Sequence, residues 1–566
     1  MISKSTLIAV PAIVGACLLL LLISPQVKTG DEVRYLFYAA SLWHHLTLTM
    51  SAAEWANVSP QLLGYKMGLP YLGDGTLVGH PVYVEFILFP LAAFGSAGLR
   101  AGGLAAGILG LLCLFFVLRR ENSPIAALPA VIIAALSIPL ISYIHTYWIE
   151  VFVFCAVAIG IYQLPKAGKG FASDMWRAGL ILLIPYVHLR ASVIGAAIFI
   201  AFLARVYSAV GWRPIRFVAL CILAALFLVL LLVGNYEIYG AITGSVTTAR
   251  PPSPFEALSV VAMQATDIKG IFPYAPIWLL GCAGLIIASY RKNRLAIECL
   301  CFLVVALFTS IGVNPGEGWP ARFFVALVPM LTVGLSFWFF YISNGWQASV
   351  TAVLCGLTAV NSILFLFAPN KLLENRQADT TFTYIFQKIG GLNIGLFEPV
   401  EGINPGLARG IMVALACVIG LCAYGSISKR IWPTVSAAVV ILCFLEIGRV
   451  SSVPLSVTAH GQTLDIKFPE LHRRTYVQIG HLWERWDMPP AWPTLTVTKV
   501  TQGGPYETIS TRPNQVIFAA CETGVSAVKV TGNNINLPGE AKYGVQAYKS
   551  DSILLAIYDK FFDTCE

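Results

Sequence analysis

Two adjacent acids, Asp31 and Glu32, follow the first apolar stretch of the chain. That stretch, from Leu7 to Ile23, is long enough to cross a bilayer, which takes roughly 20 apolar residues. Charged groups at the mouth of a membrane helix are costly and are often functional. A carboxylate there can act as a general base or bind a cation. The alternative is structural, because Asp31 can cap a helix that starts at Glu32.

A third acid, Glu150, lies at another predicted junction between two apolar runs, in the segment from His145 to Glu150. Tyr147 and Trp148 in this segment also suit an ordinary interfacial belt of aromatic residues. That explanation does not cover Glu150, because a carboxylate facing lipid costs a few kcal/mol. Glu150 is therefore a candidate site residue, with His145 and Tyr147 as candidate substrate contacts.

Cationic groups join these acids on the same predicted face. His188 and Arg190 interrupt an apolar run and need either a water-filled cavity or an anionic partner, unless residues 188–190 are only a tight outer turn. Arg322 opens a later run, and arginine matches the oxygens of a phosphate well, although an arginine there can also simply extend to the interface. Further candidate substrate contacts are Arg34, Tyr35, Lys66, His80, Tyr274, Glu317 and Trp319. For Lys66 and His80, a solvated loop is the simpler interpretation.

The composition determines what positions these groups. The chain has 566 residues, of which 57% are hydrophobic and 12% are charged, with a mean hydropathy of +0.74. These values are typical of an α-helical polytopic membrane protein. Much of the net charge of +8 lies in short loops between apolar runs, so it gives orientation and does not indicate nucleic-acid binding.

Apolar runs separated by breakers predict about thirteen membrane spans. Residues 81–95 are too short to span comfortably and are expected in the interface. The run 178–205 is interrupted and predicts two short or tilted helices. The predicted spans are approximately 5–24, 100–118, 124–143, 149–164, 178–189, 191–205, 216–233, 274–290, 295–312, 322–342, 348–368, 407–427 and 431–448.

Basic residues fall in alternate loops, among them Arg119-Arg120 and Arg291-Lys292-Arg294, and place the N-terminus and those loops in the cytoplasm. An odd number of spans then places the tail outside. We therefore predict a transmembrane catalytic domain at 1–448, with its first outer loop at 25–99, and an extracytoplasmic domain at 449–566.

The tail predicts a small α+β domain. A polar stretch near 468–486 is expected to be helical, whereas Thr494–Val500, Gln515–Ala519 and Val525–Val530 are expected to be strands. Of the 13 cysteines, only Cys521 and Cys565 fall in this tail, where an exported domain could pair them.

Together these residues favour sugar transfer from a lipid phosphate. Such a reaction needs a carboxylate that receives the acceptor proton, cations that stabilise the departing phosphate, and an apolar groove for the lipid.

Five motifs also occur in the order found in the GT-C superfamily of membrane glycosyltransferases, and the chain resembles its bacterial family-39-like members over about residues 1–345. The superfamily includes protein O-mannosyltransferases, lipid A aminoarabinose transferases and prokaryotic arabinofuranosyltransferases. The last motif is one residue shorter than the family pattern. The motifs are Gly30-Asp31-Glu32-Val33-Arg34-Tyr35, Tyr147-Trp148-Ile149-Glu150, Pro185 to Arg190, Tyr274-Ala275-Pro276 and Gly318-Trp319-Pro320-Ala321-Arg322-Phe323.

The resemblance implies a GT-C-like fold in the bacterial inner membrane. It also implies inverting transfer of a single sugar from a polyprenyl-phosphate donor to a glycan, lipid or protein acceptor on the outer face. By the resemblance Asp31 would be the base and Glu150 a second acid, and Glu32 is a further catalytic candidate. The sequence contains no dedicated metal-ligand spacing, so we expect no essential cofactor, although family members differ in their need for a divalent cation such as Mg²⁺ or Mn²⁺.

Two alternatives stay open. A flippase or transporter of lipid-linked sugars would place ionisable residues near the middle of the membrane. A polysaccharide polymerase or ligase usually carries key arginines and a histidine in one large late outer loop. Here the loop 369–406 contains Lys371, Arg376 and Lys388 but no histidine.

Overall fold

A computed structural model describes residues 4–23, 32–63, 82–240, 242, 270–309, 322–367, 405–428 and 436, together with nine strands between residues 450 and 550. Within this part of the chain, five helical stretches are long and apolar enough to cross a membrane. They are Glu85–Glu121, Ile149–Lys166, Leu189–Val210, Pro214–Tyr239 and Phe324–Tyr341. The prediction of a helical multi-pass protein is confirmed at this level. The count of about thirteen spans is not established, because several predicted spans form shorter helices and the last one, 431–448, lies almost wholly outside the described residues.

Helix α1 (Lys4–Ile23) packs on α5 (Gly95–Glu121) and α6 (Pro124–Leu136), and α5 packs along α8 (Ile149–Gln163). Glycines make the approach of α5 to its neighbours close. A Cβ atom at Gly103 would overlap the carbonyl oxygen of Thr146, and one at Gly110 would press on the ring of Phe154. Small residues at such positions are how membrane helices reach close packing.

The predicted span 124–143 is divided in two, which corrects the sequence prediction. Helix α6 ends at Leu136, and α7 (Leu140–Tyr143) follows after Ser137-Ile138-Pro139. Pro139 lacks the N–H that a continuous helix would need. The chain then reaches Trp148, which is extended (φ −108°, ψ 143°), before α8 begins. This break leaves the segment 144–148 non-helical and buried.

The irregular run near 178–205 forms α9 (Phe171–Leu182), α10 (Ile184–Val187), the 3₁₀ turn η3 (Leu189–Ala191) and α11 (Ser192–Val210). The prediction of two helices interrupted near His188 agrees with this arrangement, although the first helix starts earlier than expected. Helix α12 (Pro214–Tyr239) follows and packs mainly on α9. Only 11% of an 18-residue apolar stretch of α12 is buried in the protein. Most of the surface of α12 therefore suits contact with lipid.

The second half contains α14 (Ile271–Tyr274), α15 (Trp278–Tyr290), α16 (Arg294–Thr309), η4 (Arg322–Leu327), α17 (Val328–Tyr341), α18 (Gly345–Phe367) and α21 (Pro405–Ser428). Helices α15 and α17 make the most extensive helix–helix contact in the described part of the chain. Gly281 and Gly284 of α15 face Gly334 of α17 so closely that a Cβ atom at Gly284 would overlap the carbonyl oxygen of Gly334.

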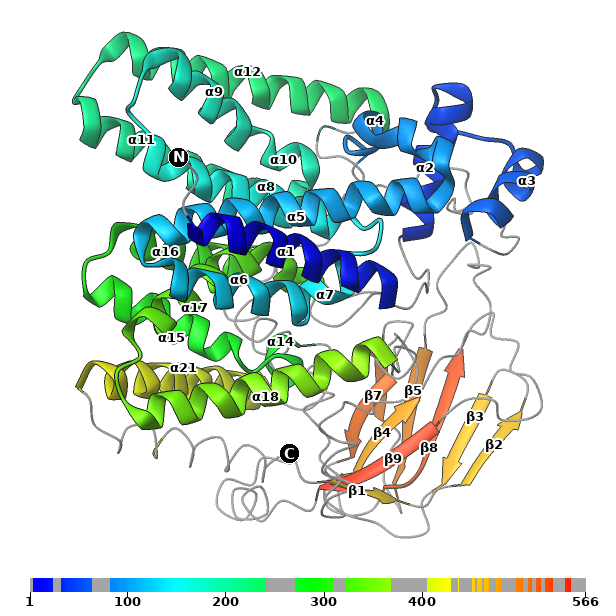
Figure 1. The fold of residues 1–566 in the computed structure, drawn as a ribbon. Coiled ribbons are helices and arrows are strands. Elements are labelled where there is room, and N and C mark those ends of the chain that lie inside the picture. Colours follow the sequence, from blue (N-terminus) through cyan, green and yellow to red (C-terminus); the bar gives the residue numbers. More distant parts are fainter. Residues whose placement is uncertain are drawn as a thin grey trace.

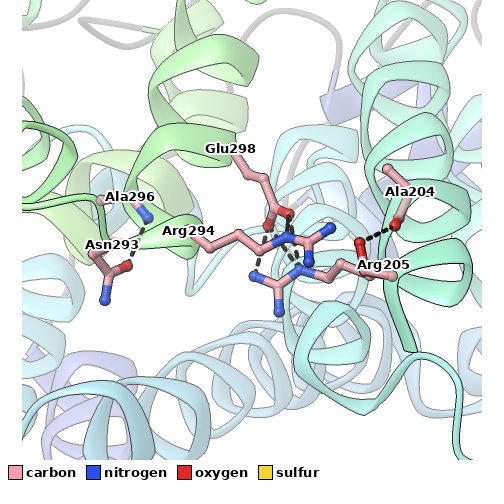
Figure 2. A network of polar contacts seen from close by, with 7 residues as sticks. Ala204, Arg205, Asn293, Arg294, Ala296 and Glu298 are labelled. Carbon is pink, nitrogen blue, oxygen red and sulfur yellow. Dashed lines mark hydrogen bonds and ion pairs between the residues drawn. The ribbon is translucent and has the colours of Figure 1, made fainter.

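The loops predicted to face the cytoplasm gather at one end of these helices. Figure 2 shows Glu298 of α16 accepting hydrogen bonds from Arg205 of α11 at 2.7–2.9 Å and from Arg294 at 3.1 Å. Buried Asp174 of α9 similarly binds Arg177 and Arg216. Arg119 donates to Thr6 beside the N-terminus, which brings the first and second predicted inner segments together.

At the opposite end lie α2 (Glu32–His45), α3 (Ala52–Leu63), α4 (Glu85–Leu88) and η1 (Phe89–Phe94). In Figure 1, α1 runs from the end marked N toward the end at which α2 and α3 lie. The segment 81–95, which we expected in the interface, forms α4 and η1, and both pack against α2. The loop 25–99, which we predicted to lie outside, is therefore largely helical in its described residues.

The tail contains two antiparallel sheets. One has the order β1-β9-β4-β7 and the other the order β2-β3-β8-β5-β6. The strands are β1 (Val450–Val453), β2 (Ser456–His460), β3 (Thr463–Lys467), β4 (Thr475–Ile479), β5 (Leu495–Thr501), β6 (Glu507–Thr511), β7 (Val516–Ala520), β8 (Val525–Gly532) and β9 (Val545–Ser550).

The three strands predicted in the tail agree with β5, β7 and β8. The helix predicted near 468–486 is wrong at its centre, because Thr475–Ile479 is strand β4, in the middle of its sheet. The sequence Thr-Tyr-Val-Gln-Ile explains this, since β-branched and aromatic residues favour a pleated surface. After residue 449 the described residues are strands only, so the α component of the predicted α+β domain is not seen among them.

Candidate active site

Glu32, the first residue of α2, is fully buried and anchored on both oxygens. Arg100 of α5 donates from Nε to Oε1 at 3.2 Å and from Nη2 to Oε2 at 3.4 Å. The backbone N–H of Tyr147 also donates to Oε1, at 2.9 Å. A buried carboxylate needs such partners, because an unpaired charge away from water is very costly. The first predicted motif is thereby held against the second.

Glu150, the second residue of α8, forms an ion pair with Arg322, the first residue of η4. Both side chains are less than one-tenth exposed. The guanidinium carbon of Arg322 also lies 4.6 Å from the centre of the Trp148 ring. Glu150 accepts through Oε1, whereas its Oε2 has no hydrogen-bond partner among the described residues. The second and the last predicted motifs therefore meet through a carboxylate, an arginine and an indole.

Trp148 is the point at which these segments meet. Its ring lies edge-on to Tyr35 of α2, with 6.4 Å between ring centres, and to Tyr143 of α7, with 5.6 Å. Arg322 lies over the same ring. Three segments distant in sequence, around residues 32–35, 147–150 and 322, are thus in contact at one end of the helices.

Other predicted site residues make contacts of their own. His145 is buried, with Nδ1 at 3.0 Å from the carbonyl oxygen of Ile141 and its ring 6.4 Å from that of Phe365. The carbonyl oxygen of Tyr274 accepts a hydrogen bond of 2.8 Å from Asn361 of α18. Arg34 is half-buried on α2.

His188 and Arg190 form a local turn, in which Nδ1 of His188 accepts from the backbone N–H of Arg190 at 3.1 Å. Both side chains are half-buried. The neighbouring Tyr186 packs its ring 5.3 Å from that of Tyr83 and donates to the carbonyl oxygen of Phe227 in α12. Asp31, Lys66, His80, Glu317 and Trp319 lie outside the described part of the chain.

Two residues at this end were missed by the sequence analysis. Arg100 was assigned only to the start of a span, although it is the partner of Glu32. Glu85 of α4 is a carboxylate that is 1% exposed, and its Oε2 lacks a hydrogen-bond partner among the described residues. The signal for Glu85 was available, since it is the one acid in the apolar segment 81–95.

Burial affects the titration of this region. The pKa of Tyr147 lies well above its ordinary value, first because the phenol is buried and second because the negative charge of Glu85 is nearby. Tyr147 therefore stays a neutral phenol that can donate or accept a hydrogen bond. Within the described residues, no three histidine, cysteine or acidic side chains lie together as a metal-binding group.

No known protein family matches the sequence, and no curated protein is similar to it. Among solved structures, ArnT from Cupriavidus metallidurans in the apo state is similar with a TM-score of 0.43 and 13% identity, over 78% of this chain and 75% of that chain. The structure of ArnT from the same organism bound to undecaprenyl phosphate gives a TM-score of 0.42 and 14% identity, over the same shares of the two chains. TM-scores below 0.5 do not establish a shared fold.

Proposed function

We propose that the chain is a membrane glycosyltransferase that moves a single sugar, with inversion, from a polyprenyl-phosphate donor to a cell-envelope glycan, lipid or protein acceptor. The observation that carries the proposal is the junction at Trp148, where Glu150, Arg322 and Tyr35 meet from three separate segments. A buried arginine and carboxylates at the mouth of membrane helices suit a reaction whose leaving group is a phosphate.

We assign Asp31 as the general base, because it directly precedes Glu32, the residue anchored by Arg100 and Tyr147. Glu32 itself uses both oxygens to accept hydrogen bonds, so its proposed role changes from catalysis to positioning. Its contacts fix the start of α2 against α5 and the segment before α8. A base is effective only when it is held within hydrogen-bond reach of its proton.

Arg322 is the group that we assign to the departing phosphate. Its guanidinium is stacked on Trp148 and paired with Glu150, which fixes its plane, and a fixed guanidinium matches phosphate oxygens in a bidentate manner. Glu150 thus acts first as a positioning residue for Arg322. Its second oxygen, Oε2, is oriented by the same ion pair and is assigned to the acceptor.

The positions of these groups favour an enzyme over a flippase. Glu32, Glu150 and Arg322 are the first or second residues of α2, α8 and η4, so they lie at helix ends. A transporter is expected to bind its substrate near the middle of the membrane. We further propose that residues 1–448 form the catalytic domain in the bacterial inner membrane, with the tail at 449–566 outside, and that no divalent cation is essential.

The direct test is sugar transfer by purified protein in detergent, with a panel of polyprenyl-phosphate hexoses and pentoses and with envelope extracts as acceptor. We expect wild-type protein to release polyprenyl phosphate from one donor and Asp31→Asn to release almost none. Absence of release from every donor by folded protein would contradict the proposal and favour a lipid-flipping assay. Glu54→Gln, on the exposed surface of α3, is the control for removing a carboxylate at this end.

A further inference from the structure

Two buried polar groups at the outer end are unused by the roles assigned above. Glu85 and Tyr147 are each 1% exposed. The Glu85 Oε2 atom and the Tyr147 hydroxyl both lack a hydrogen-bond partner within the described residues. Buried polar groups are nearly always paired in native proteins, and the exceptions often mark a ligand or a functional site.

The segments that carry these two groups both contact α2. The negative charge of Glu85 also contributes to the raised pKa of the Tyr147 phenol. Helix α4, which carries Glu85, packs against α2, and Tyr147 binds the first residue of α2 through its backbone N–H. Glu85 is therefore enclosed by the elements that build the proposed active site.

Tyr147 also connects the pair to the proposed chemistry. Tyr147 directly precedes Trp148, whose ring lies under the guanidinium of Arg322, and it lies three residues before Glu150. The indole N–H of Trp148 and Oε2 of Glu150 are likewise without a partner in the described part of the chain. The segment 147–150 thus carries three buried polar atoms without a partner among the described residues, and Oε2 of Glu85 is a fourth.

We propose that Glu85 and the Tyr147 hydroxyl form a subsite that binds hydroxyl groups of the donor sugar. The inference rests on the proposed function. A sugar offers adjacent hydroxyls, each both donor and acceptor, which match a carboxyl oxygen and a phenol hydroxyl. The flat rings of Tyr147 and Trp148 supply apolar surface beside them, which sugar C–H faces also need.

The test compares Tyr147→Phe and Glu85→Gln with wild type, using the active donor and a set of donors that each lack one hydroxyl. For the complete donor, we expect Tyr147→Phe to lower kcat/KM about 3- to 10-fold, as for loss of one neutral hydrogen bond, and Glu85→Gln to lower it by more. With the donor that lacks the contacted hydroxyl, the same variant should lose little, because variant and deoxy donor remove the same interaction.

Two controls and one binding measurement make the test specific. Tyr341→Phe removes a phenol hydroxyl at the other end of the helices, where Arg291 lies over the ring, and should leave kcat/KM unchanged. Glu54→Gln removes an exposed carboxylate near Ser51 and should also have no effect. Binding of sugar-free polyprenyl phosphate should be the same in Tyr147→Phe and wild type.

The outcomes separate this inference from the function on which it rests. If wild type transfers sugar but kcat/KM of both variants falls by the same factor with every deoxy donor, the proposed sugar subsite is wrong and the glycosyltransferase function stands. If Glu85→Gln instead lowers both activity and the binding of sugar-free polyprenyl phosphate, Glu85 acts on the phosphate and not on a sugar hydroxyl. If added divalent cation restores the activity of Glu85→Gln, Glu85 acts on a metal ion. If no transfer occurs, sugar-selective loss of donor binding in Tyr147→Phe would support the subsite and overturn the enzyme.

Discussion

The guanidinium of Arg100 lies 3.2 Å from the carboxylate of Glu32, and both side chains are almost completely buried. The pair joins the first residue of α2 to the first turns of α5, across 68 positions of sequence. Since Asp31 precedes Glu32, this pair is the nearest described anchor for the proposed base.

Breaking this pair from one side should be strongly destabilising. We expect Glu32→Gln or Arg100→Leu to cost about 3–5 kcal/mol, because each leaves a buried polar or charged group without its partner. Thermal unfolding in detergent measures the loss. The double variant Glu32→Gln/Arg100→Leu should lose less than the sum of the two single losses, because the two side chains interact, and losses that simply add would show that the pair contributes nothing beyond packing.

The proposed base gives the sharpest activity prediction. Asp31→Asn should lower sugar transfer roughly 10²- to 10⁴-fold, the usual effect of removing a general base, while donor binding changes little. Single-turnover transfer and donor binding are measured on the same preparation. A variant that keeps more than about a tenth of wild-type activity would exclude Asp31 as the base.

Arg322 should respond to the shape of its replacement as well as to its charge. Arg322→Lys keeps the positive charge but loses the planar, bidentate guanidinium and its stacking on Trp148. Arg322→Ala loses the charge as well. We expect donor affinity to fall in both, and further in Arg322→Ala. Equal, small effects in the two variants would indicate an arginine that only extends to the interface.

The contact between α15 and α17 offers a matched pair of glycine variants. Gly334→Ala should destabilise the protein by about 1–3 kcal/mol or more, because the new methyl group meets the backbone of Gly281. Gly356→Ala in α18 adds the same group where nothing lies within 4 Å, so stability should be unchanged or slightly higher. Thermal unfolding of both proteins in the same detergent checks this, and similar losses at the two sites would contradict the close approach.

Chelation tests the proposal that no divalent cation is essential. We expect transfer to persist after EDTA treatment, because Arg322 already supplies positive charge for the leaving phosphate. The measurement is the initial rate before and after chelation, with Mg²⁺ and Mn²⁺ added back separately. Loss of activity that only a metal restores would overturn this expectation.

Periodicity and apolar runs predicted much of the fold. The span 149–164 corresponds to α8 (Ile149–Gln163), and the first span corresponds to α1 (Lys4–Ile23), because long apolar segments have few alternatives in a membrane. The division of 124–143 was missed, since one proline inside an apolar run can be either tolerated or a break, depending on its neighbours. The strand at Thr475–Ile479 was missed because it is only five residues long and lies inside a polar stretch that was predicted to be helical.

The site was predicted less completely, for a physical reason. Glu150 and Arg322 were each recognisable as charged groups beside apolar runs, but their pairing across 172 positions depends on tertiary packing. Arg100 and Glu85 carry the same kind of signal, a charge within an apolar segment, and weighing every such charge would have found them. Whether a carboxylate is anchored, as in Glu32, or partly unpaired, as in Glu85, is decided by neighbours that no local pattern contains.

The shared indole of Trp148 has a kinetic consequence. Tyr35 reaches it from the segment of the proposed base, and Arg322 reaches it from the proposed phosphate site. A ligand that shifts Arg322 must therefore change the surroundings of Tyr35, so the two substrates should not bind independently. By thermodynamic reciprocity, a donor that tightens acceptor binding is itself bound more tightly when the acceptor is present. Initial-rate measurements with both substrates varied should accordingly show cooperation between them, and that cooperation should weaken in Trp148→Leu.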